Sequence, residues 1–167
     1  MVKISNDGVN FGNGSGVLID YDEILTCYHV VNGYSYFKIN YNSRDKDVTC
    51  SVQDTAPSHD AAVLTPPDKN VKPVKIGDSD EVKVGDKVYV ISCPEGEKNV
   101  VTEGEVLKTN SFINFRIGFE ISPITKGGSS GGACFNAKGE LIGIVQSGDD
   151  VSTFIVPINS IRQALAE

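Results

Sequence analysis

The amino-acid sequence predicts an all-β protein that folds as two small packed barrels and ends in a short helix. Apolar and polar residues alternate in short runs along most of the 167 residues, and this period is typical of half-buried strands. Turn-forming residues such as Asn32-Gly33, Pro94-Glu95-Gly96 and Lys138-Gly139 separate the runs. Many short strands at this spacing indicate a β-sandwich or a β-barrel.

The predicted strands fall into two sets of about six, divided by a proline- and lysine-containing connection over residues 66–80. Only the last segment is predicted to be helical, because Asn159 or Ser160 can cap a helix over Ile161–Ala166. The predicted strands are Gly16–Asp20, Glu23–Thr26, Tyr34–Asn40, Val48–Asp54, Ala61–Thr65, Lys87–Ser92, Val100–Lys108, Phe112–Ile121, Ala133–Phe135, Leu141–Gln146 and Phe154–Val156.

These elements are expected to form a single domain over residues 1–167. Its first barrel spans residues 1–70, its second barrel residues 71–157, and its C-terminal helix residues 158–167. A chain of this length buries roughly 70% of its unfolded surface, so neither a metal nor a disulfide is needed to hold the fold.

Composition and charge limit which partners and which cellular compartment are expected for this chain. The net charge is −7, with 22 acidic against 15 basic residues, so a nucleic-acid partner is not expected. No stretch approaches the ~20 apolar residues of a membrane span, so membrane insertion is not expected either. The first eight residues lack the apolar core of a signal peptide, and we therefore expect a cytoplasmic location. Composition predicts no particular oligomeric state.

The four cysteines, Cys27, Cys50, Cys93 and Cys134, lie far apart and form no CxxC pair. We interpret them as reduced thiols in the core rather than as disulfides. A zinc site is not expected, because the paired ligand spacing of such sites is absent. No other metal or cofactor is predicted.

Three segments carry residues that could take part in catalysis. Leu25–Val31 reads as a strand and a short turn that presents His29, and His59–Leu64 sets Asp60 before an apolar strand. Gly127–Gly132 is a glycine-rich turn around Ser130. Each segment alone is a weak signal, since such a turn is more often a flexible loop and such an aspartate a turn residue. Their order along the chain, with gaps of 31 and 70 residues, makes the joint interpretation far more specific.

The chemistry explains why these residue types belong together. A serine hydroxyl becomes a good nucleophile when a neighbouring imidazole accepts its proton. That imidazole needs an acid on its other nitrogen, and the oxyanion of the substrate needs two converging backbone N–H groups. The sequence therefore predicts Ser130 as nucleophile, His29 as general base and Asp60 as the orienting acid. Gly128 and Ser130 are the predicted oxyanion-hole donors.

At these motifs the sequence resembles the trypsin/chymotrypsin superfamily of serine proteases, and most closely its bacterial HtrA/Deg branch. The resemblance runs from about residue 14 to residue 161. It implies a chymotrypsin-like fold of two six-stranded antiparallel barrels, an active site between them, and peptide-bond hydrolysis through an acyl-enzyme. The segments that carry it are Gly14–Ile19, Ile24–Val31, Asp60–Leu64, Ile76–Ser79, Val84–Val88, Gly128–Gly132 and Gly143–Gly148.

Three departures from the family pattern are informative. Trypsin-like zymogens carry an aspartate just before the nucleophile, but Ser129 stands there, so no activation cleavage is expected. Many relatives have a serine near the triad acid where this chain has Gln146. No PDZ-like segment is expected after the protease-like part of the sequence.

The resemblance also points to substrate-binding residues. Ile124 stands six residues before Ser130, where trypsin-like enzymes use an acid to bind Lys or Arg. Together with Thr125 and Thr153 it is expected to line an apolar pocket for a small aliphatic residue before the scissile bond. An extended protein or peptide substrate is expected to pair its backbone with Gln146, Ser147 and Gly148.

Two further residues and two rival functions compete with this interpretation. His59 is expected to be exposed and to point away from Asp60, and Asp54 to be structural. The main rival is a catalytically silent module that uses the same fold to bind peptides or a partner protein, since fold does not guarantee function. The second is a peptidase dedicated to one substrate.

Overall fold

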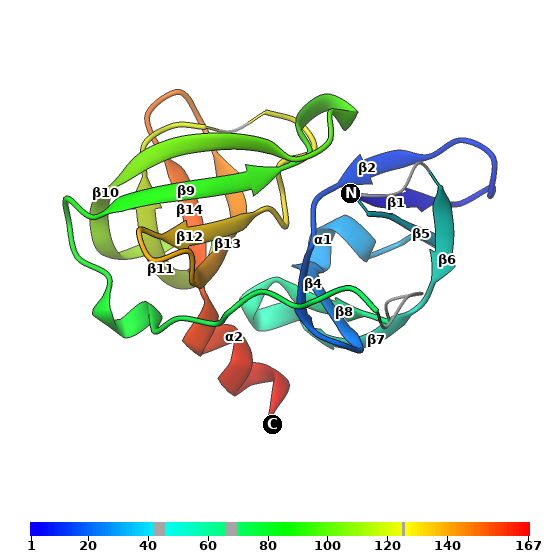
Figure 1. Cartoon of the computed structure of the whole chain (residues 1–167), viewed down its shortest axis with the longest axis horizontal. Coiled ribbons are helices and arrows are strands. Elements are labelled where there is room, and N and C mark those ends of the chain that lie inside the picture. The colour runs from blue at the N-terminus through cyan, green and yellow to red at the C-terminus, as the bar shows by residue number, and fades with distance from the viewer. Residues whose placement is uncertain (42–45, 66–69, 125) are drawn as a thin grey trace.

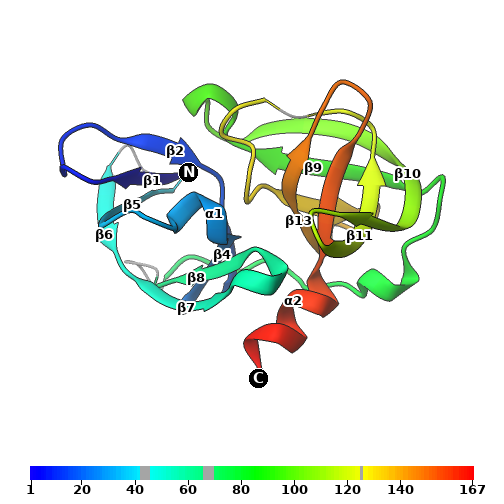
Figure 2. The ribbon, with the colours of Figure 1, turned by 180° about the vertical axis from the view of Figure 1, so that it is seen from behind.

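The computed structural model describes residues 1–41, 46–65, 70–124 and 126–167. Two β-rich halves lie side by side, and the C-terminal helix lies beneath the junction between them (Figure 1; Figure 2 gives the opposite view). Strands β1 to β8 form the first half, and strands β9 to β14 form the second. No helix among the described residues is long and apolar enough to span a bilayer.

The first half contains two four-stranded sheets, with strand orders β2-β1-β5-β6 and β3-β4-β8-β7. Three short helical turns accompany its strands and the connection that follows them. The elements are β1 (Val2–Ser5), β2 (Gly12–Gly14), β3 (Val17–Asp20), β4 (Glu23–Cys27), α1 (Tyr28–Val31), β5 (Tyr36–Asn40), β6 (Asp47–Cys50), β7 (Val52–Ala56), η1 (Pro57–His59), β8 (Ala61–Leu64) and η2 (Ser79–Glu81).

Two bends explain why these sheets are separate. The predicted strand Val48–Asp54 breaks at Ser51, so that β6 pairs with β5 and β7 pairs with β8. A similar break at residues 15–16 leaves β2 paired with β1 and β3 paired with β4. Strands that bend in this way switch between two packed sheets. Closure of this half into a six-stranded barrel therefore stays a prediction.

The second half is a closed six-stranded barrel with the order β10-β11-β14-β13-β12-β9, as predicted. All its strand pairs are antiparallel. Its elements are β9 (Lys87–Ser92), η3 (Pro94–Gly96), β10 (Val100–Ile113), β11 (Arg116–Ile121), β12 (Ala133–Asn136), β13 (Leu141–Gly148), β14 (Thr153–Pro157) and α2 (Ile158–Leu165).

A continuous core joins the two halves. One cluster of buried side chains unites Leu25, Ala61 and Leu64 of the first half with Leu141 and Ile144 of the second. A second cluster fills the interior of the closed barrel. Because the larger cluster crosses the junction, the halves form a single packed unit that can hold residues from both in fixed positions.

The C-terminal helix differs from its prediction at its beginning. It begins at Ile158 rather than Ile161, directly after Pro157, and no side chain of its own segment caps it. Instead Ser79 Oγ accepts a hydrogen bond from the Asn159 backbone N–H at 3.1 Å. The cap comes from a distant part of the chain, so the predicted cap at Asn159 or Ser160 was wrong.

The cysteine prediction holds for most of the thiols. All four cysteines are free, and Cys27, Cys93 and Cys134 are buried. Cys50 is only half-buried, because it lies at the end of β6, beside the bend. Burial raises the pKa of the Cys50 thiol to about 12 and also raises the pKa of the Cys134 thiol.

Candidate active site

The side chains of His29 and Asp60 are brought together by the beginning of helix α1. The first N–H groups of a helix have no hydrogen-bond acceptor within the helix. In α1, Asp60 supplies acceptors for two of these N–H groups. Its carbonyl accepts from Tyr28 N at 2.9 Å, and its Oδ1 accepts from His29 N at 2.8 Å. Asp60 therefore caps the helix that carries His29, and the cap fixes the distance between the two residues.

The second carboxylate oxygen of Asp60 lies 2.7 Å from His29 Nδ1. The imidazole tautomer that carries its proton on Nδ1 donates this hydrogen bond, which leaves Nε2 as the acceptor. The Asp60 side chain is 3% exposed, whereas the His29 side chain is 47% exposed. The buried acid thus orients the imidazole, and the face of the imidazole opens to solvent.

Asp60 remains ionised in spite of its burial. Burial raises the pKa of its carboxyl, but hydrogen bonds from the His29 ring and backbone, the charge of His29 and the Gln146 amide act in the opposite direction, and the net pKa is lowered. Asp60 also has a left-handed backbone conformation (φ 51), which costs of the order of 1–3 kcal/mol. The surrounding contacts must offset this strain.

Ser130 and His29 line one cavity of about 440 Å³. The cavity is also lined by Gln146, Ser147 and Gly148 of β13, by Gly127 of the glycine-rich turn and by Lys126, which precedes that turn. The Ser130 hydroxyl donates to the Gln146 carbonyl at 3.3 Å. The structure thus brings the predicted base and nucleophile to the same cavity, with the hydroxyl turned toward β13.

The turn around Ser130 has a left-handed backbone at Gly128 (φ 92) and Gly131 (φ 83). A Cβ at Gly131 would lie 2.2 Å from the Ser15 carbonyl oxygen, so only glycine fits there. Among the described residues, the N–H groups of Gly128 and Ser130 are not donors in any backbone hydrogen bond of the turns and loops. The role of these two N–H groups as oxyanion-hole donors stays a prediction.

The predicted specificity residues do not all reach the cavity of Ser130. Thr153 is fully buried, and its hydroxyl accepts from Ile124 N at 3.0 Å. Ile124 lines a neighbouring cavity of about 470 Å³ and packs on the core of the closed barrel. Thr125 lies outside the described residues. Lys126 lines both cavities.

The competing acid and histidine lie apart from this site. His59 is half-buried rather than exposed, because it belongs to the η1 turn and not to a strand, and its Nδ1 lies 3.0 Å from Ser58 Oγ. Asp54 is exposed on β7, and its carboxylate accepts from Thr55 N at 2.7 Å.

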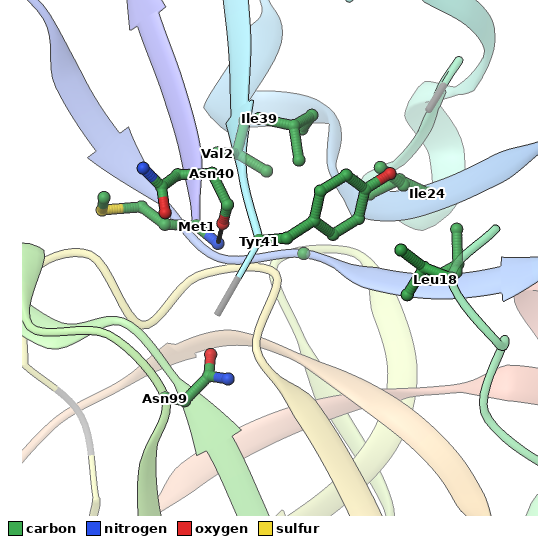
Figure 3. A pocket seen from close by; sticks show the side chains of 10 residues that line it. Met1, Val2, Leu18, Ile24, Ile39, Asn40, Tyr41 and Asn99 are labelled. Carbon is green, nitrogen blue, oxygen red and sulfur yellow. Dashed lines mark hydrogen bonds between the residues drawn. The ribbon is translucent and has the colours of Figure 1, made fainter. Parts of the chain in front are cut away.

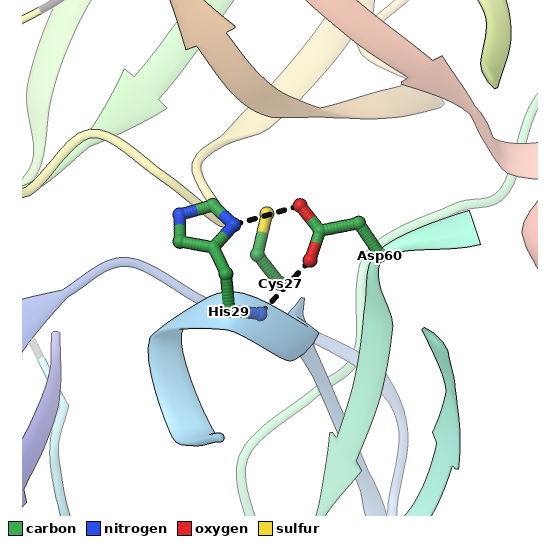
Figure 4. Close-up of side chains that lie close together, drawn as sticks. All are labelled: Cys27, His29 and Asp60. Atoms are coloured by element: carbon green, nitrogen blue, oxygen red, sulfur yellow. Dashed lines mark hydrogen bonds and ion pairs between the residues drawn. The ribbon is translucent and has the colours of Figure 1, made fainter. Parts of the chain in front are cut away.

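Cys27 lies behind the imidazole–carboxylate pair (Figure 4). One potential ligand atom each from Cys27, His29 and Asp60 lies within 4.8 Å of the others, a spacing that a metal ion could bridge. Burial, and then the charge of Asp60, raises the pKa of the Cys27 thiol well above its usual range, and the thiol donates to the Val145 carbonyl at 3.1 Å. A protonated thiol is a poor metal ligand, so the geometry fits packing rather than metal binding.

A separate cavity of about 330 Å³ is lined mostly by residues of the first half, together with Val71 and Asn99. Figure 3 shows Val2, Leu18, Ile24, Ile39 and Tyr41 around it. Among the described residues that line it there is no carboxylate, histidine or serine. His29 and Ser130 line the other cavity instead.

Comparison with known proteins agrees with this geometry. A family model described as a trypsin-like peptidase domain matches residues 14–144. The chain belongs to the trypsin-like peptidase family. The family prediction made from the sequence is therefore confirmed.

Two curated relatives of this trypsin-like peptidase domain come from different bacteria. "Serine protease HtrA-like" of Staphylococcus haemolyticus is 32% identical over 98% of this chain and 30% of its own length. "Probable periplasmic serine endoprotease DegP-like" of Pseudomonas putida (strain F1) is 35% identical over 78% of this chain and 28% of its own length. The chain thus spans about three-tenths of the length of these relatives.

The names of the relatives correct one prediction. The DegP-like proteins are called periplasmic, which points to a periplasmic or secreted location, and the expectation of a cytoplasmic location is therefore wrong. That expectation rested on the composition of the first eight residues. This composition does not record the compartment in which a folded domain works.

Solved structures show the same fold. The HtrA-type protease AlgW with a tripeptide aligns over 99% of this chain and 59% of its own, with a TM-score of 0.87 and 25% identity. The Rv3671c protease from M. tuberculosis in its active form aligns over 99% of this chain and 78% of its own, with a TM-score of 0.85 and 22% identity. The trypsin-like peptidase domain therefore has the chymotrypsin-like architecture.

Sequence reasoning missed three residues that lie beside the nucleophile turn. Asn13 donates to the Cys93 carbonyl at 3.0 Å, Ser15 donates to the Gly128 carbonyl at 2.7 Å, and Lys126 lines the cavity. The only sequence signal was the Gly14-Ser15-Gly16 run, which was interpreted as part of a strand. Its partners lie about a hundred residues away along the chain, and local patterns do not reveal such contacts.

Proposed function

We propose that this domain is a serine endopeptidase with Ser130 as nucleophile, His29 as general base and Asp60 as the acid that orients His29. The observation that carries the proposal is the convergence of His29 and Ser130 on one cavity, with Asp60 bonded to the far nitrogen of the imidazole. Membership of the trypsin-like peptidase family supports it. The order of events follows from these positions.

The first step is attack by Ser130. Its hydroxyl leaves the Gln146 carbonyl by rotation about its Cα–Cβ bond to another staggered position. Its oxygen then bonds to the carbonyl carbon of the substrate while His29 Nε2 takes its proton. The buried Asp60 carboxylate stabilises the imidazolium that forms. The peptide C–N bond breaks as the imidazolium returns the proton to the leaving amine, and water then hydrolyses the acyl-enzyme by the reverse sequence.

The negative charge of the tetrahedral intermediate falls on the former carbonyl oxygen. The N–H groups of Gly128 and Ser130 are the donors proposed for it. Loss of one such donor costs about 2.7–4 kcal/mol of transition-state stabilisation in serine proteases. Because the proposed donors belong to the backbone, their direction depends on the conformation of the turn rather than on a side-chain rotamer.

The proposed substrate is a protein or peptide in an extended conformation. Strand β12 pairs with β13 only from Leu141 to Ile144, while β14 pairs with β13 on its other side as far as Gly148. Among the described strands, none covers the first edge of Gln146–Gly148, which lies beside the cavity. An extended peptide can add itself as a strand at such an edge. The tripeptide and decapeptide named with AlgW structures are compatible with this class of ligand.

The proposed preference is a small aliphatic residue before the scissile bond, because apolar Ile124 stands where an acid would attract Lys or Arg. The neighbouring cavity supports a different preference, for a basic residue. Glu95, Glu97, Asp149 and Asp150 all line it together with Ile124, and these carboxylates would attract a basic side chain. Cleavage of a peptide library decides between the two, and a dominant preference for Lys or Arg would refute the aliphatic pocket.

Labelling with a fluorophosphonate probe tests the nucleophile directly, because such probes phosphonylate activated serines. We expect one probe per chain, attached to Ser130, no labelling of Ser130→Ala and much slower labelling of His29→Ala. Circular dichroism and thermal unfolding confirm that each variant is folded. If the folded wild-type chain stays unlabelled, the catalytically silent module becomes the better interpretation.

A further inference from the structure

We propose that Ser15 is a positioning residue that holds the oxyanion hole in its working shape, an inference that rests on the serine-peptidase function proposed above. Ser15 lies at the bend between β2 and β3 in the first half and is 1% exposed. The nucleophile turn belongs to the second half. Ser15 therefore links the two halves at the point where the proposed chemistry takes place.

Three hydrogen bonds of Ser15 reach two loops of the second half. Its Oγ accepts from Cys93 N at 2.7 Å and donates to the Gly128 carbonyl at 2.7 Å. Its backbone N–H donates to the Ser130 carbonyl at 2.8 Å. Ser15 thus holds a carbonyl on each side of Ser129, inside the segment that carries the two proposed oxyanion donors.

Because the peptide bond is planar, hydrogen bonds to the carbonyl groups of this turn also fix the directions of the Gly128 and Ser130 N–H groups. In a trans peptide the C=O and the following N–H point in opposite directions, so fixing one fixes the other. The Gly127 carbonyl accepts from Glu95 N at 2.6 Å, which directs the Gly128 N–H away from Glu95. The Ser129 carbonyl accepts from Gly132 N at 2.8 Å, which likewise directs the Ser130 N–H. The peptide plane between these two is held through the Gly128 carbonyl by Ser15.

The loop that contains Glu95 is itself held by the first half. Asn13 Nδ2 donates to the Cys93 carbonyl at 3.0 Å, and Ser15 Oγ accepts from the N–H of the same residue. A Cβ at Gly128 would lie 2.5 Å from Asn13 Nδ2, so Asn13 packs too closely against Gly128 for any side chain to fit there. Asn13 and Ser15 together brace both loops that shape the proposed oxyanion hole.

Loss of the Ser15 hydroxyl has a specific consequence. The Gly128 carbonyl and the Cys93 N–H lose their hydrogen-bond partner in a buried place, which favours rotation of the peptide planes. The donors then lose alignment with an oxygen that becomes anionic only in the transition state. Pairing of the substrate with β13 does not involve Ser15. We therefore expect kcat to fall while KM for an extended peptide stays nearly unchanged.

The test compares Ser15→Ala with wild type and with Ser5→Ala, in the full chain. Ser5 is the matched control because it is another buried serine of the first half (2% exposed), and its Oγ also accepts backbone N–H groups, from Asp7 and Gly8. We measure kcat and KM on a fluorogenic peptide, together with the inhibition constants of a peptidyl boronate and of the matching free peptide acid. The boronate forms a tetrahedral adduct at Ser130 and reports on the oxyanion hole.

For Ser15→Ala we expect kcat and boronate affinity to fall by about tenfold to a hundredfold, less than the 10²–10³-fold loss of a direct donor. Affinity for the peptide acid should change by less than about threefold. Ser5→Ala should lose thermal stability but keep kcat and boronate affinity. If Ser15→Ala and Ser5→Ala lose the same fraction of kcat, or if KM rises while kcat holds, the positioning role is refuted.

A second variant keeps the inference testable if Ser15→Ala does not fold. Asn13→Asp keeps the size of a half-buried side chain but replaces the donor to the Cys93 carbonyl with an acceptor. It should lower kcat and boronate affinity together, and unchanged values would refute the brace. Fluorophosphonate labelling of wild type separates the two proposals. If the probe labels wild type and Ser15→Ala keeps the wild-type kcat, only the proposed role of Ser15 is refuted. If the probe does not label wild type, both the peptidase function and the role of Ser15 are refuted.

Discussion

The carboxylate of Asp60 accepts two hydrogen bonds from His29, one from the backbone N–H at 2.8 Å and one from ring Nδ1 at 2.7 Å. The first contact caps helix α1, and the second fixes the tautomer of the imidazole. Because one buried carboxylate makes both contacts, the backbone of the helix and the plane of the ring are set together. Asp60 therefore has a structural and an electrostatic part in the site.

Replacing Asp60 with asparagine separates shape from charge. The amide has one oxygen instead of two, so its NH2 group must face one of the two His29 donors. We expect Asp60→Asn to lower kcat by about ten-thousand-fold, the loss that this change causes in the trypsin-like enzymes that define the triad. The measurement is kcat on a peptide substrate, with circular dichroism as the control for folding. A folded variant that loses less than about tenfold would remove Asp60 from the proposed mechanism.

The lowered pKa of Asp60 predicts how stability depends on pH. The folded-state pKa lies below the usual value of 3.8, so ionised Asp60 stabilises the fold at pH values above 3.8. This contribution is lost as the pH falls below 3.8 and through the folded-state pKa. Urea unfolding of wild type and Asp60→Asn between pH 6 and pH 3 tests it. The difference in unfolding free energy should be constant above about pH 5 and shrink below pH 4, and a widening difference would contradict the sign.

Gly131 offers a test of how tightly the nucleophile turn is packed against the first half. Gly131 and Gly33 share the same φ of 83°, but a Cβ would lie 2.2 Å from the Ser15 carbonyl at Gly131 and meet nothing within 4 Å at Gly33. Gly33→Ala should cost about 1–2 kcal/mol from backbone strain alone. Gly131→Ala should cost about 3 kcal/mol or more, because the clash adds to the strain. Equal losses in urea unfolding would show that the turn can move away from Ser15.

The residues proposed for catalysis could be found from the sequence because local motifs surround them. His29 follows an apolar strand, Asp60 precedes one, and Ser130 lies among glycines, so each segment carries its own signal. Ser15 has no such signal, since its side-chain partners Cys93 and Gly128 lie 78 and 113 residues away. Contacts of this kind arise from the packing of the two halves and are visible only in the folded molecule.

Strand prediction succeeded where apolar alternation is long and failed where the chain is short or bent. Strand β9 has its predicted bounds, Lys87–Ser92. Strands β1 and β2, with four and three residues, were not predicted, because a run this short gives only a weak periodic signal. The predicted gap between Lys108 and Phe112 is an irregularity inside β10, where the register shifts between Lys108 and Ser111.

The four cysteine thiols are expected to react slowly with thiol reagents while the chain is folded. Cys50 is the most accessible of them, yet burial raises its pKa to about 12, so only a very small fraction of this thiol is the reactive thiolate at pH 8. We expect Ellman's reagent to react with the native chain much more slowly than with glutathione at the same pH. After unfolding in guanidinium chloride, all four cysteines should react at once. Rapid, stoichiometric reaction of the native chain would contradict the burial of Cys27, Cys93 and Cys134.

The hairpin between β10 and β11 contains a turn that works against stability. Asn114 and Phe115 have positive φ values of 51° and 63°, which is the geometry of a type I′ turn that favours Asn-Gly. Phe115 is 93% exposed, and its ring contacts the Phe112 ring edge-on, at 6.4 Å between centroids. A bulky residue in this conformation costs about 1–2 kcal/mol, more than the roughly 0.5 kcal/mol that the ring contact returns.

We therefore expect Phe115→Gly to stabilise the domain by about 0.5–1 kcal/mol, measured as a higher midpoint in urea unfolding. Phe115→Ala is the matched control, because it removes the same ring but keeps a Cβ in the left-handed conformation. It should be no more stable than wild type. If Phe115→Gly gains nothing over Phe115→Ala, the backbone strain at this turn is relieved by contacts of the strands that flank it, and the positive φ carries no net cost.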